Sequence, residues 1–394
     1  MTTLAKGAGS QLAFIAEATY GTTPATPGFT TLEFAGESMG LARDSLASNA
    51  INATRNRKFH SYGNLQVGGD INGEFVYSQW DEFISSAMFE NWTATNAIAS
   101  ADHSGGAGVN FITITADVAS SFPTGRKVVI TGSTANDGSY TLASDAVYTA
   151  STKLIFTEAL TDSTADGDVD AFIINGITQQ PVSIEKKITS TAADLYFRHV
   201  GCLADTMNIV MGQNALTTIS FGFMGQNELT TGIVSGATYS DAANLGINPL
   251  DSFSGYLNEG GSASNIVTGI TLNVANNLEA AFVVGQTTLK EIIEGALIIV
   301  SGTLSLYIEN LTLYNKFVNG TALSLEFQFT DPNSGIVLDD TYTFFLPNIR
   351  YTGNSAPIAG SGAVINNMPF EAIAAGSGAG AYTCLIARHP ATDA

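Results

Sequence analysis

Most of this chain alternates apolar and polar residues with a period of two, and this pattern constrains the fold more than any other feature. In one such segment Leu304, Leu306 and Ile308 share a face, while threonine, serine and tyrosine alternate with them. Successive side chains of a β-strand point to opposite faces, so the pattern indicates strands with one buried face. Turn residues separate these segments, which lie at 217–224, 266–274, 302–309, 322–329 and 341–346. The sequence therefore predicts a mainly β protein with an antiparallel core.

One segment, residues 78–92, has a helical period instead. Its apolar residues recur at i, i+3, i+4, i+7 and i+8 and form a single stripe. Ser78 is a suitable N-cap, and Asp81 and Glu82 would interact favourably with the helix dipole. We expect this helix to cover one face of the sheet, and we expect a shorter second helix at 289–295. The predicted packing face consists of Trp80, Phe83, Ile84, Ala87 and Met88.

Residues 96–177 differ in composition from the sequence on either side. The stretch 94–108 is rich in Ala, Ser and Gly and resembles a linker, and Asn136-Asp137-Gly138 is a strong hairpin turn. Short strands are predicted at Phe111–Thr115, Lys127–Thr131, Ser139–Ala143, Lys153–Thr157 and Ala171–Ile174. We therefore predict a small immunoglobulin-like β-sandwich at 96–177, inserted between two parts of the core at 1–95 and 178–394.

A polar stretch at residues 41–60 has only weak periodicity and is unusually basic. It holds Arg43, Arg55, Arg57 and Lys58. With the single acidic residue Asp44 its net charge is +3, on a chain whose net charge is −20. A long loop in a compact domain is usually functional or disordered. We interpret the stretch as an arm that contacts an acidic surface; a solvated loop is the alternative.

The charge content limits the classes of function. Only 13% of the residues are charged, against 45% hydrophobic, so copies of the chain itself would cover much of its surface. The alternative is a Thr/Ser-rich β protein that does not assemble. The acidic balance argues against a nucleic-acid binder. No signal peptide and no membrane-spanning stretch are recognised. Cys202 and Cys384 are too few for a disulfide framework and indicate buried thiols in a reducing compartment.

No catalytic, metal-binding or cofactor-binding motif is complete in the sequence. His199 and Cys202 form only a weak Cys–His signal. The acidic run Asp162, Asp166, Asp168 and Asp170 lacks the Gly and Glu that a calcium loop needs. We predict a protein that is not an enzyme and has no cofactor. An acid–base pair of carboxylates acting on a polysaccharide is a further alternative, because the acidic residues look alike in sequence.

Several stretches, in their order, resemble the tail tube protein family of long-tailed bacteriophages. Residues 16–24 resemble the opening of the family, and 68–75, followed by the helical segment, resemble its strand-to-helix unit. Further similar stretches are 218–225, 270–277, 300–307, 313–317 and 344–349. The resemblance covers residues 10–95 and 178–355, while 96–177 resembles small β modules that decorate phage structural proteins.

This resemblance implies a β-sandwich or barrel core with one flanking helix, whose subunits form stacked, hexameric rings around a channel for DNA ejection. It places the chain in the virion tail, assembled in the host cytoplasm. The implied partners are the chain itself, a tape-measure protein, a tail terminator and distal tail or baseplate proteins. We expect double-stranded DNA to pass the lumen without specific binding, and we expect no membrane insertion. The alternative is a capsid decoration or surface adhesin without tube assembly.

Two further expectations follow from this interpretation. The inserted module at 96–177 should lie on the outer surface of the tube, because inside the channel it would obstruct the genome. The arm at 41–60 should reach the neighbouring ring, where its basic residues would contact an acidic surface.

Overall fold

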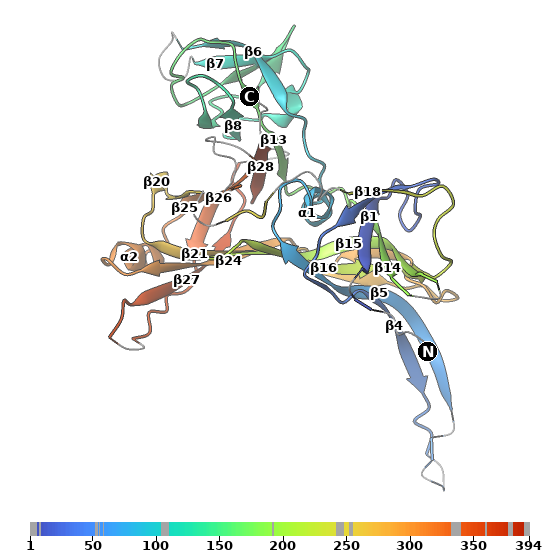
Figure 1. The fold of residues 1–394 in the computed structure, drawn as a ribbon. Coiled ribbons are helices and arrows are strands. Elements are labelled where there is room, and N and C mark those ends of the chain that lie inside the picture. Colours follow the sequence, from blue (N-terminus) through green and yellow to red (C-terminus); the bar gives the residue numbers. More distant parts are fainter. Residues whose placement is uncertain are drawn as a thin grey trace.

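The computed structural model consists of a large core sheet that folds into two layers, a smaller separate sheet and a long projecting hairpin (Figure 1). The residues that it describes are 6–7, 9–51, 54, 56–57, 59–103, 110–190, 193–241, 248–251, 255–331, 340–358, 361–376 and 381–389. The mainly β fold predicted from the sequence is confirmed. The core sheet is mixed rather than wholly antiparallel, since β18 (Thr238–Asp241) runs parallel to β2 (Gly28–Leu32).

The core sheet contains the same arrangement of strands twice, and we call the two units the first and second repeats. The first repeat comprises β1 (Gln11–Ala16), β3 (Gly36–Glu37), β4 (Gly40–Ala47), β5 (His60–Glu74), α1 (Asp81–Met88), β14 (Val182–Ile188), β15 (Leu195–Gly212), β16 (Thr218–Gly225) and β17 (Asn227–Leu229). The second comprises β19 (Leu257–Glu259), β21 (Val267–Ala275), β24 (Ile299–Tyr307), α2 (Thr312–Val318), β25 (Leu323–Thr330), β26 (Thr341–Tyr351), β27 (Ile365–Ala372) and β28 (Leu385–His389). β3 and β4 together correspond to β21, and the other elements correspond in order.

The repeats agree in strand register as well as in strand order. Strand β5 pairs with β3, β4 and β16 as β24 pairs with β21 and β27. Equivalent Cα partners are Gly36–Asn72 and Gly269–Ser305, Gly40–Gly68 and Asn273–Ser301, and Glu74–Thr218 and Tyr307–Ile365. The outer layer agrees too, because β14–β15 has a register shift after Val182, and β25–β26 has the same shift after Leu323. Such detailed agreement identifies a structural duplication that the sequence analysis did not predict.

Two glycines explain part of this shared geometry. A Cβ atom on Gly69 would lie 2.5 Å from the carbonyl oxygen of Ser38, and one on Gly302 would lie 2.1 Å from that of Thr271. These two carbonyls are themselves equivalent in the repeats. Only glycine permits such a close approach of neighbouring strands. The motif Val-x-Gly at Val67 and Val300 is a trace of the repeat in the sequence.

Helix α1 packs inside the first repeat, and its bounds differ from the prediction. It begins at Asp81 rather than after Ser78, which has a positive φ of 64° and makes no side-chain cap. It ends at Met88, because Phe89 adopts the left-handed conformation. The five predicted packing residues are each 0% exposed. The second helix was expected at the wrong place: residues 289–295 contain β23 (Glu291–Glu294), paired with β22 (Leu278–Ala281), while α2 lies later.

Residues 96–169 form a separate seven-stranded sheet, which we call the module. Its elements are β6 (Asn96–Asp102), β7 (Phe111–Ile114), a 3-10 turn (Ala119–Ser121), β8 (Lys127–Thr131), β9 (Gly138–Thr141), β10 (Val147–Tyr148), β11 (Thr152–Ile155) and β12 (Asp168–Val169). Two predictions are corrected. Residues 96–102 are a strand and not a linker, since β6 pairs with β7 and β12. The segment β13 (Ala171–Ile174) pairs with β28 of the core, where Phe172 faces Ala387.

The module also packs directly against the second repeat. Its apolar cluster continues into Phe345, Tyr382 and Leu385 of the core. Arg126 lies 4.9 Å from the ring of Tyr382, and Ser139 donates a hydrogen bond of 2.8 Å to Glu326. The module is therefore attached through packed contacts, in addition to its chain connections. In Figure 1 it projects from the side of the core opposite to the long hairpin.

Candidate tube wall and assembly surfaces

The most extensive feature of the core is a continuous row of strands that crosses both repeats, which we call the inner sheet. Its order is β4, β5, β16, β15, β21, β24 and β27, followed by the segment 352–358 that continues β26. The segment 352–358 runs along β27, because Ser355 and Asn367 exchange backbone hydrogen bonds of 3.0 and 2.8 Å. The repeats join within this row, where Asn208 of β15 faces Asn273 of β21.

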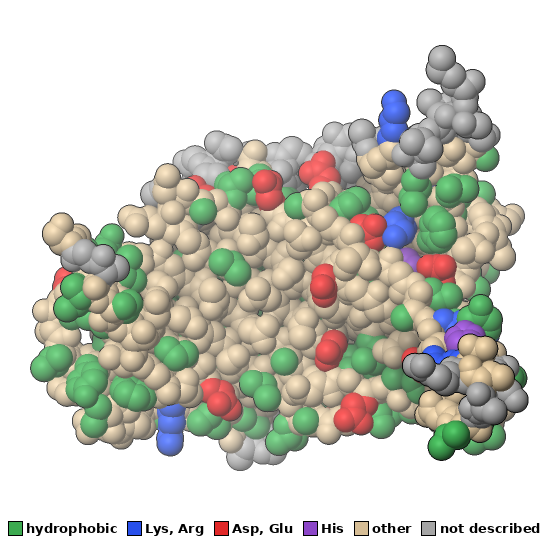
Figure 2. All heavy atoms as spheres, turned by 90° about the horizontal axis from the view of Figure 1, so that it is seen from below, with side chains coloured by type: hydrophobic (Ala, Val, Ile, Leu, Met, Phe, Trp, Pro, Cys, Tyr) green, Lys and Arg blue, Asp and Glu red, His purple; other side chains and the backbone are tan. Residues whose placement is uncertain are grey.

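One face of the inner sheet is polar and nearly uncharged. The side chains on this face alternate with buried ones such as Phe221, Leu272 and Leu304. They include Ser38, Asp70, Asn72, Glu74, Thr206, Asn208, Thr218, Ser220, Thr271, Asn273, Ser301, Thr303, Ser305, Asn367 and Glu371. Figure 2 views this underside of the sheet, and it shows scattered carboxylates and no continuous patch of Lys or Arg. Such a surface offers water many hydrogen bonds but offers phosphate few cations.

The charged groups on this face are mostly acidic. Asp70, Glu74 and Glu371 carry the carboxylates, and Arg350 faces Glu371 where β26 meets β27. Nonspecific binding of DNA depends on cations that neutralise phosphates. This face of the inner sheet therefore carries more acidic than basic groups and offers few cations to phosphate.

The opposite face of the inner sheet is held by aromatic packing around α1. The indole of Trp80 lies 5.8 Å from the ring of Phe221, and its Nε1 donates a hydrogen bond of 2.9 Å to Glu74 O. Asp81, in the first turn of α1, contacts the hydroxyl of Tyr342 and pairs with Arg388. Burial raises the pKa of Tyr342 well above its ordinary value, so this phenol stays a hydrogen-bond donor. The helix thus ties the first repeat to β26 and β28 of the second.

The predicted arm is largely a β-hairpin, formed by β4 and the first part of β5, which projects beyond the rest of the molecule (Figure 1). Arg43 lies on β4, with its guanidinium 4.4 Å from the ring centre of Tyr62. Arg57 lies near the tip, whereas Arg55 and Lys58 lie outside the described residues. Apolar side chains on the hairpin are also exposed, with Leu46 at 59% and Tyr62 at 64%.

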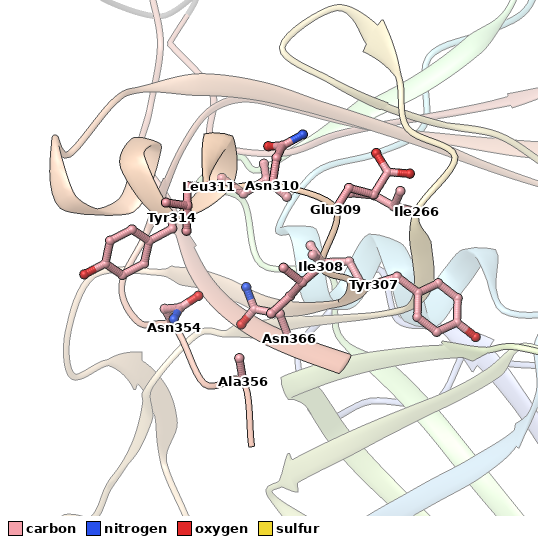
Figure 3. A pocket seen from close by; sticks show the side chains of 12 residues that line it. Ile266, Tyr307, Ile308, Glu309, Asn310, Leu311, Tyr314, Asn354, Ala356 and Asn366 are labelled. Carbon is pink, nitrogen blue, oxygen red and sulfur yellow. The ribbon is translucent and has the colours of Figure 1, made fainter. Parts of the chain in front are cut away.

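Helix α2 lies beside the far end of the inner sheet and borders a hollow of about 220 Å³ (Figure 3). None of the residues of α2 is buried. The hollow is lined by the end of β24, the start of α2 and the segment 352–358, through residues that include Tyr307, Leu311, Tyr314, Asn354 and Ala356. Its position next to an outermost strand of the inner sheet suggests a contact surface for another chain and not a small-molecule site.

The weaker sequence signals have structural explanations. His199 is buried, and its Nε2 lies 3.0 Å from Glu228 Oε2. Burial lowers the pKa of His199 and raises that of the Cys202 thiol well above its ordinary value. In the acidic run, Asp166 accepts hydrogen bonds from Ser133 and Thr134. Within the described ranges, no cluster of His, Cys, Asp and Glu could hold a metal ion.

Neither α1 nor α2 is long and apolar enough to span a bilayer, and the rest of the described chain contains no other α-helix.

The comparisons with known proteins agree with this architecture. A family described as phage tail tube protein matches residues 7–180 and 177–372. No curated protein matches the chain. The two matched segments together span most of the sequence, and the resemblance noted in the sequence is confirmed. The chain therefore belongs to the phage tail tube protein family and is a structural, non-enzymatic protein of the virion tail.

Proposed function

We propose that this chain assembles into stacked rings with a hexameric arrangement of repeats, whose inner sheets join around a channel for DNA ejection. The observation that carries this proposal is the continuous inner sheet, with one polar face and an outermost strand at each end. A sheet with exposed edges must pair or protect them, and closure into a ring pairs them all. The polar face would then line the channel.

The charge of this face supports passage of DNA without specific binding. Asp70, Glu74 and Glu371 would repel phosphates, and the strands present few cations that could hold them. A genome could then slide past the wall.

The two projections suggest further roles in the assembled tail. The module would lie on the outer surface of the tube, since it projects from the side of the core opposite to the polar face (Figures 1 and 2). The arm would contact the adjoining ring through its basic residues and exposed apolar side chains. A tape-measure protein in the lumen, and terminator and distal tail proteins at the two ends of the tube, are the expected partners.

Electron microscopy of the purified chain tests this proposal. The expected result is rings and tubes with a central channel, and a reconstruction should show a lumen without a continuous basic lining. Interfaces between chains should exceed about 2,000 Å², as obligate assemblies require. A chain that stays monomeric at high concentration, or a lumen lined with Lys and Arg, would contradict the proposal.

A further inference from the structure

The duplication allows the contact between neighbouring chains to be derived from a contact that already exists inside one chain. At the internal junction, β15 of the first repeat pairs with β21 of the second. The equivalent of β15 at the end of the second repeat is the continuation of β26, and the equivalent of β21 at the start of the first is β3 and β4. Among the described residues, β4 pairs only with β5, and the segment 352–358 pairs only with β27.

The register expected between neighbouring chains follows from the equivalence of residues in the two repeats. Asn208 faces Ser220 in the first repeat as Ser355 faces Asn367 in the second, so Ser355 is the equivalent of Asn208. The equivalent of Asn273 is Gly40, because their partners, Ser301 and Gly68, occupy matching positions in β24 and β5.

We propose that residues 353–358 of one copy pair antiparallel with residues 37–42 of the next copy, with Ser355 facing Gly40. Since each chain supplies two repeats, a ring of six repeats then contains three chains and has threefold symmetry, with its repeats in a pseudo-sixfold arrangement. This inference rests on the proposed tube function, and it adds the identity of the lateral interface, its register and the number of chains.

The backbone hydrogen bonds fit this register. Ser355 directs both its N–H and its C=O toward Asn367, so toward the next copy it takes part in a non-hydrogen-bonded pair. The bonds across the new junction come from its neighbours Asn354 and Ala356, which would face Leu41 and Met39.

In the single chain, charged side chains bind the outward backbone groups of Met39, at the edge formed by residues 37–42. The N–H of Met39 donates a hydrogen bond of 3.0 Å to Glu37 Oε2, and its C=O accepts one of 2.9 Å from Lys186 Nζ. Lys186 and Glu37 also form an ion pair at 3.2 Å. Charged groups that occupy an edge keep it from pairing with unsuitable strands. Docking of the next copy replaces these two side-chain contacts with backbone bonds.

Apolar side chains are exposed beside the segment 352–358, as expected for a surface that another chain covers. Leu311, Tyr314 and Ile358 are exposed beside this edge, and they border the hollow of Figure 3 or lie next to it in sequence. At the internal junction, the equivalent surface of the first repeat is covered by the second repeat. By this equivalence, a second copy of the chain covers the surface.

Disulfide cross-linking tests the register. Cα atoms of a non-hydrogen-bonded pair lie about 4.5 Å apart, within the roughly 4.4–6.8 Å that a disulfide spans. The double variant Gly40→Cys with Ser355→Cys should lose its 41.0 kDa monomer band after mild oxidation of assembled rings. A Cβ atom at Gly40 meets nothing within 4 Å, so this substitution is tolerated. The native Cys202 and Cys384 are buried, and burial raises the pKa of both thiols, so they should not react.

Two matched variants control the experiment. Asn208→Cys with Asn273→Cys should form the equivalent disulfide inside single chains, even before assembly. Ser38→Cys with Ser355→Cys shifts the pair by two residues on the same face, to a diagonal distance of about 7–8 Å, and should cross-link poorly.

The outcomes separate this inference from the proposed function. The expected ladder of covalent species ends at three chains, because closure joins each chain to two neighbours. Rings that form without the Ser355–Gly40 cross-link, or that cross-link better through Ser38, would overturn the register. A ladder that continues to six chains would overturn the stoichiometry. The absence of any ring, with the internal control still cross-linked, would instead contradict the tube function itself.

Discussion

Both repeats have a hairpin at the equivalent position, but only one of the two hairpins packs against the rest of the chain. The arm of the first repeat and the β22–β23 hairpin of the second have the same length between the equivalent pairs Ala42–Gln66 and Ala275–Ile299. The β22–β23 hairpin folds onto the first repeat, where its buried residue Ile292 belongs to a cluster with Leu203. The arm projects away from the body (Figure 1).

The helices show the same contrast. Helix α1 is covered on its apolar side, and Asn276 at the start of the β22–β23 hairpin donates a hydrogen bond of 2.9 Å to Ala87 O near its end. Helix α2 has no buried residue. Burial in this duplicated chain therefore depends on which segment follows each repeat. The second repeat covers the end of the first, and nothing within the described chain covers the end of the second in the same way.

The largest expected effect concerns the two helices. Trp80→Ala should lower the free energy of unfolding by about 3–5 kcal/mol, because it creates a cavity under the inner sheet and removes the Nε1 hydrogen bond. Tyr314→Ala in α2 should change it by less than about 0.5 kcal/mol, since this side chain is half-exposed. Chemical denaturation of the unassembled chain measures both. Equal losses in the two variants would show that α2 is packed as tightly as α1.

The two hairpins provide the next test. Ile292→Ala should cost about 2–3 kcal/mol, because Ile292 is buried against the first repeat. The control Leu46→Ala, in the exposed arm, should leave the unassembled chain within about 0.5 kcal/mol of the wild type. A large loss with Leu46→Ala would mean that the arm packs on its own chain in solution.

Charge reversal in the arm distinguishes its possible neighbours. The variant with Arg55, Arg57 and Lys58 all changed to Glu should keep its circular dichroism spectrum and form single rings that do not stack. Exposed ion pairs contribute only about 0–1 kcal/mol each, so the loss reflects several contacts repeated around each ring. Changing the same residues to Gln should weaken stacking less.

Two other results of this experiment are informative. Full-length tubes at physiological salt would show that the arm is not an electrostatic clamp between rings. Failure of the rings themselves to close would indicate that the arm folds onto its lateral neighbour, as the β22–β23 hairpin folds onto the first repeat.

Of the large elements of the chain, the module should be the one whose replacement affects assembly least. We expect a Gly/Ser linker in place of residues 96–169 to leave rings and tubes visible by microscopy, provided that β13 is kept for its pairing with β28. Because the replacement exposes Phe345, Tyr382 and Leu385, these should be made polar in a second variant to preserve solubility. A folded monomer that no longer forms rings would place the module at an assembly interface.

The smallest effect is expected from the ion pair between Lys187 and Asp194 of the first repeat. It has no counterpart among the described residues of the second repeat. Lys187 Nζ lies 3.1 Å from Asp194 Oδ2, and this hydrogen bond lowers the pKa of Asp194 and raises that of Lys187. Its contribution is present between the two pKa values; it is lost as pH falls through the lowered pKa of Asp194 or rises through the raised pKa of Lys187. In Lys187→Gln, an NMR titration should show the pKa of Asp194 returning toward 3.8. An unchanged pKa would mean that the pair is not formed in solution.

The local elements of this protein follow from patterns in its sequence. The alternation around Leu304 and Leu306 specified a strand with one buried face, and the stripe from Trp80 to Met88 specified a helix, because each period matches one backbone geometry. The order of weak motifs was sufficient to indicate the tail tube family.

Which strands are neighbours depends instead on long-range pairing in the folded chain. A period of two indicates that one face of a strand is buried, but it does not identify the strand with which it pairs. For this reason the sequence did not predict that Ala171–Ile174 pairs with β28 of the core and not with a strand of the module. Residues 289–295 became a strand because β22 offered backbone partners, which outweighed local helical tendency. The duplication and the two outer edges at Gly40 and Ser355 depend on register between segments far apart in the chain. Register arises from long-range pairing, and no local pattern records it.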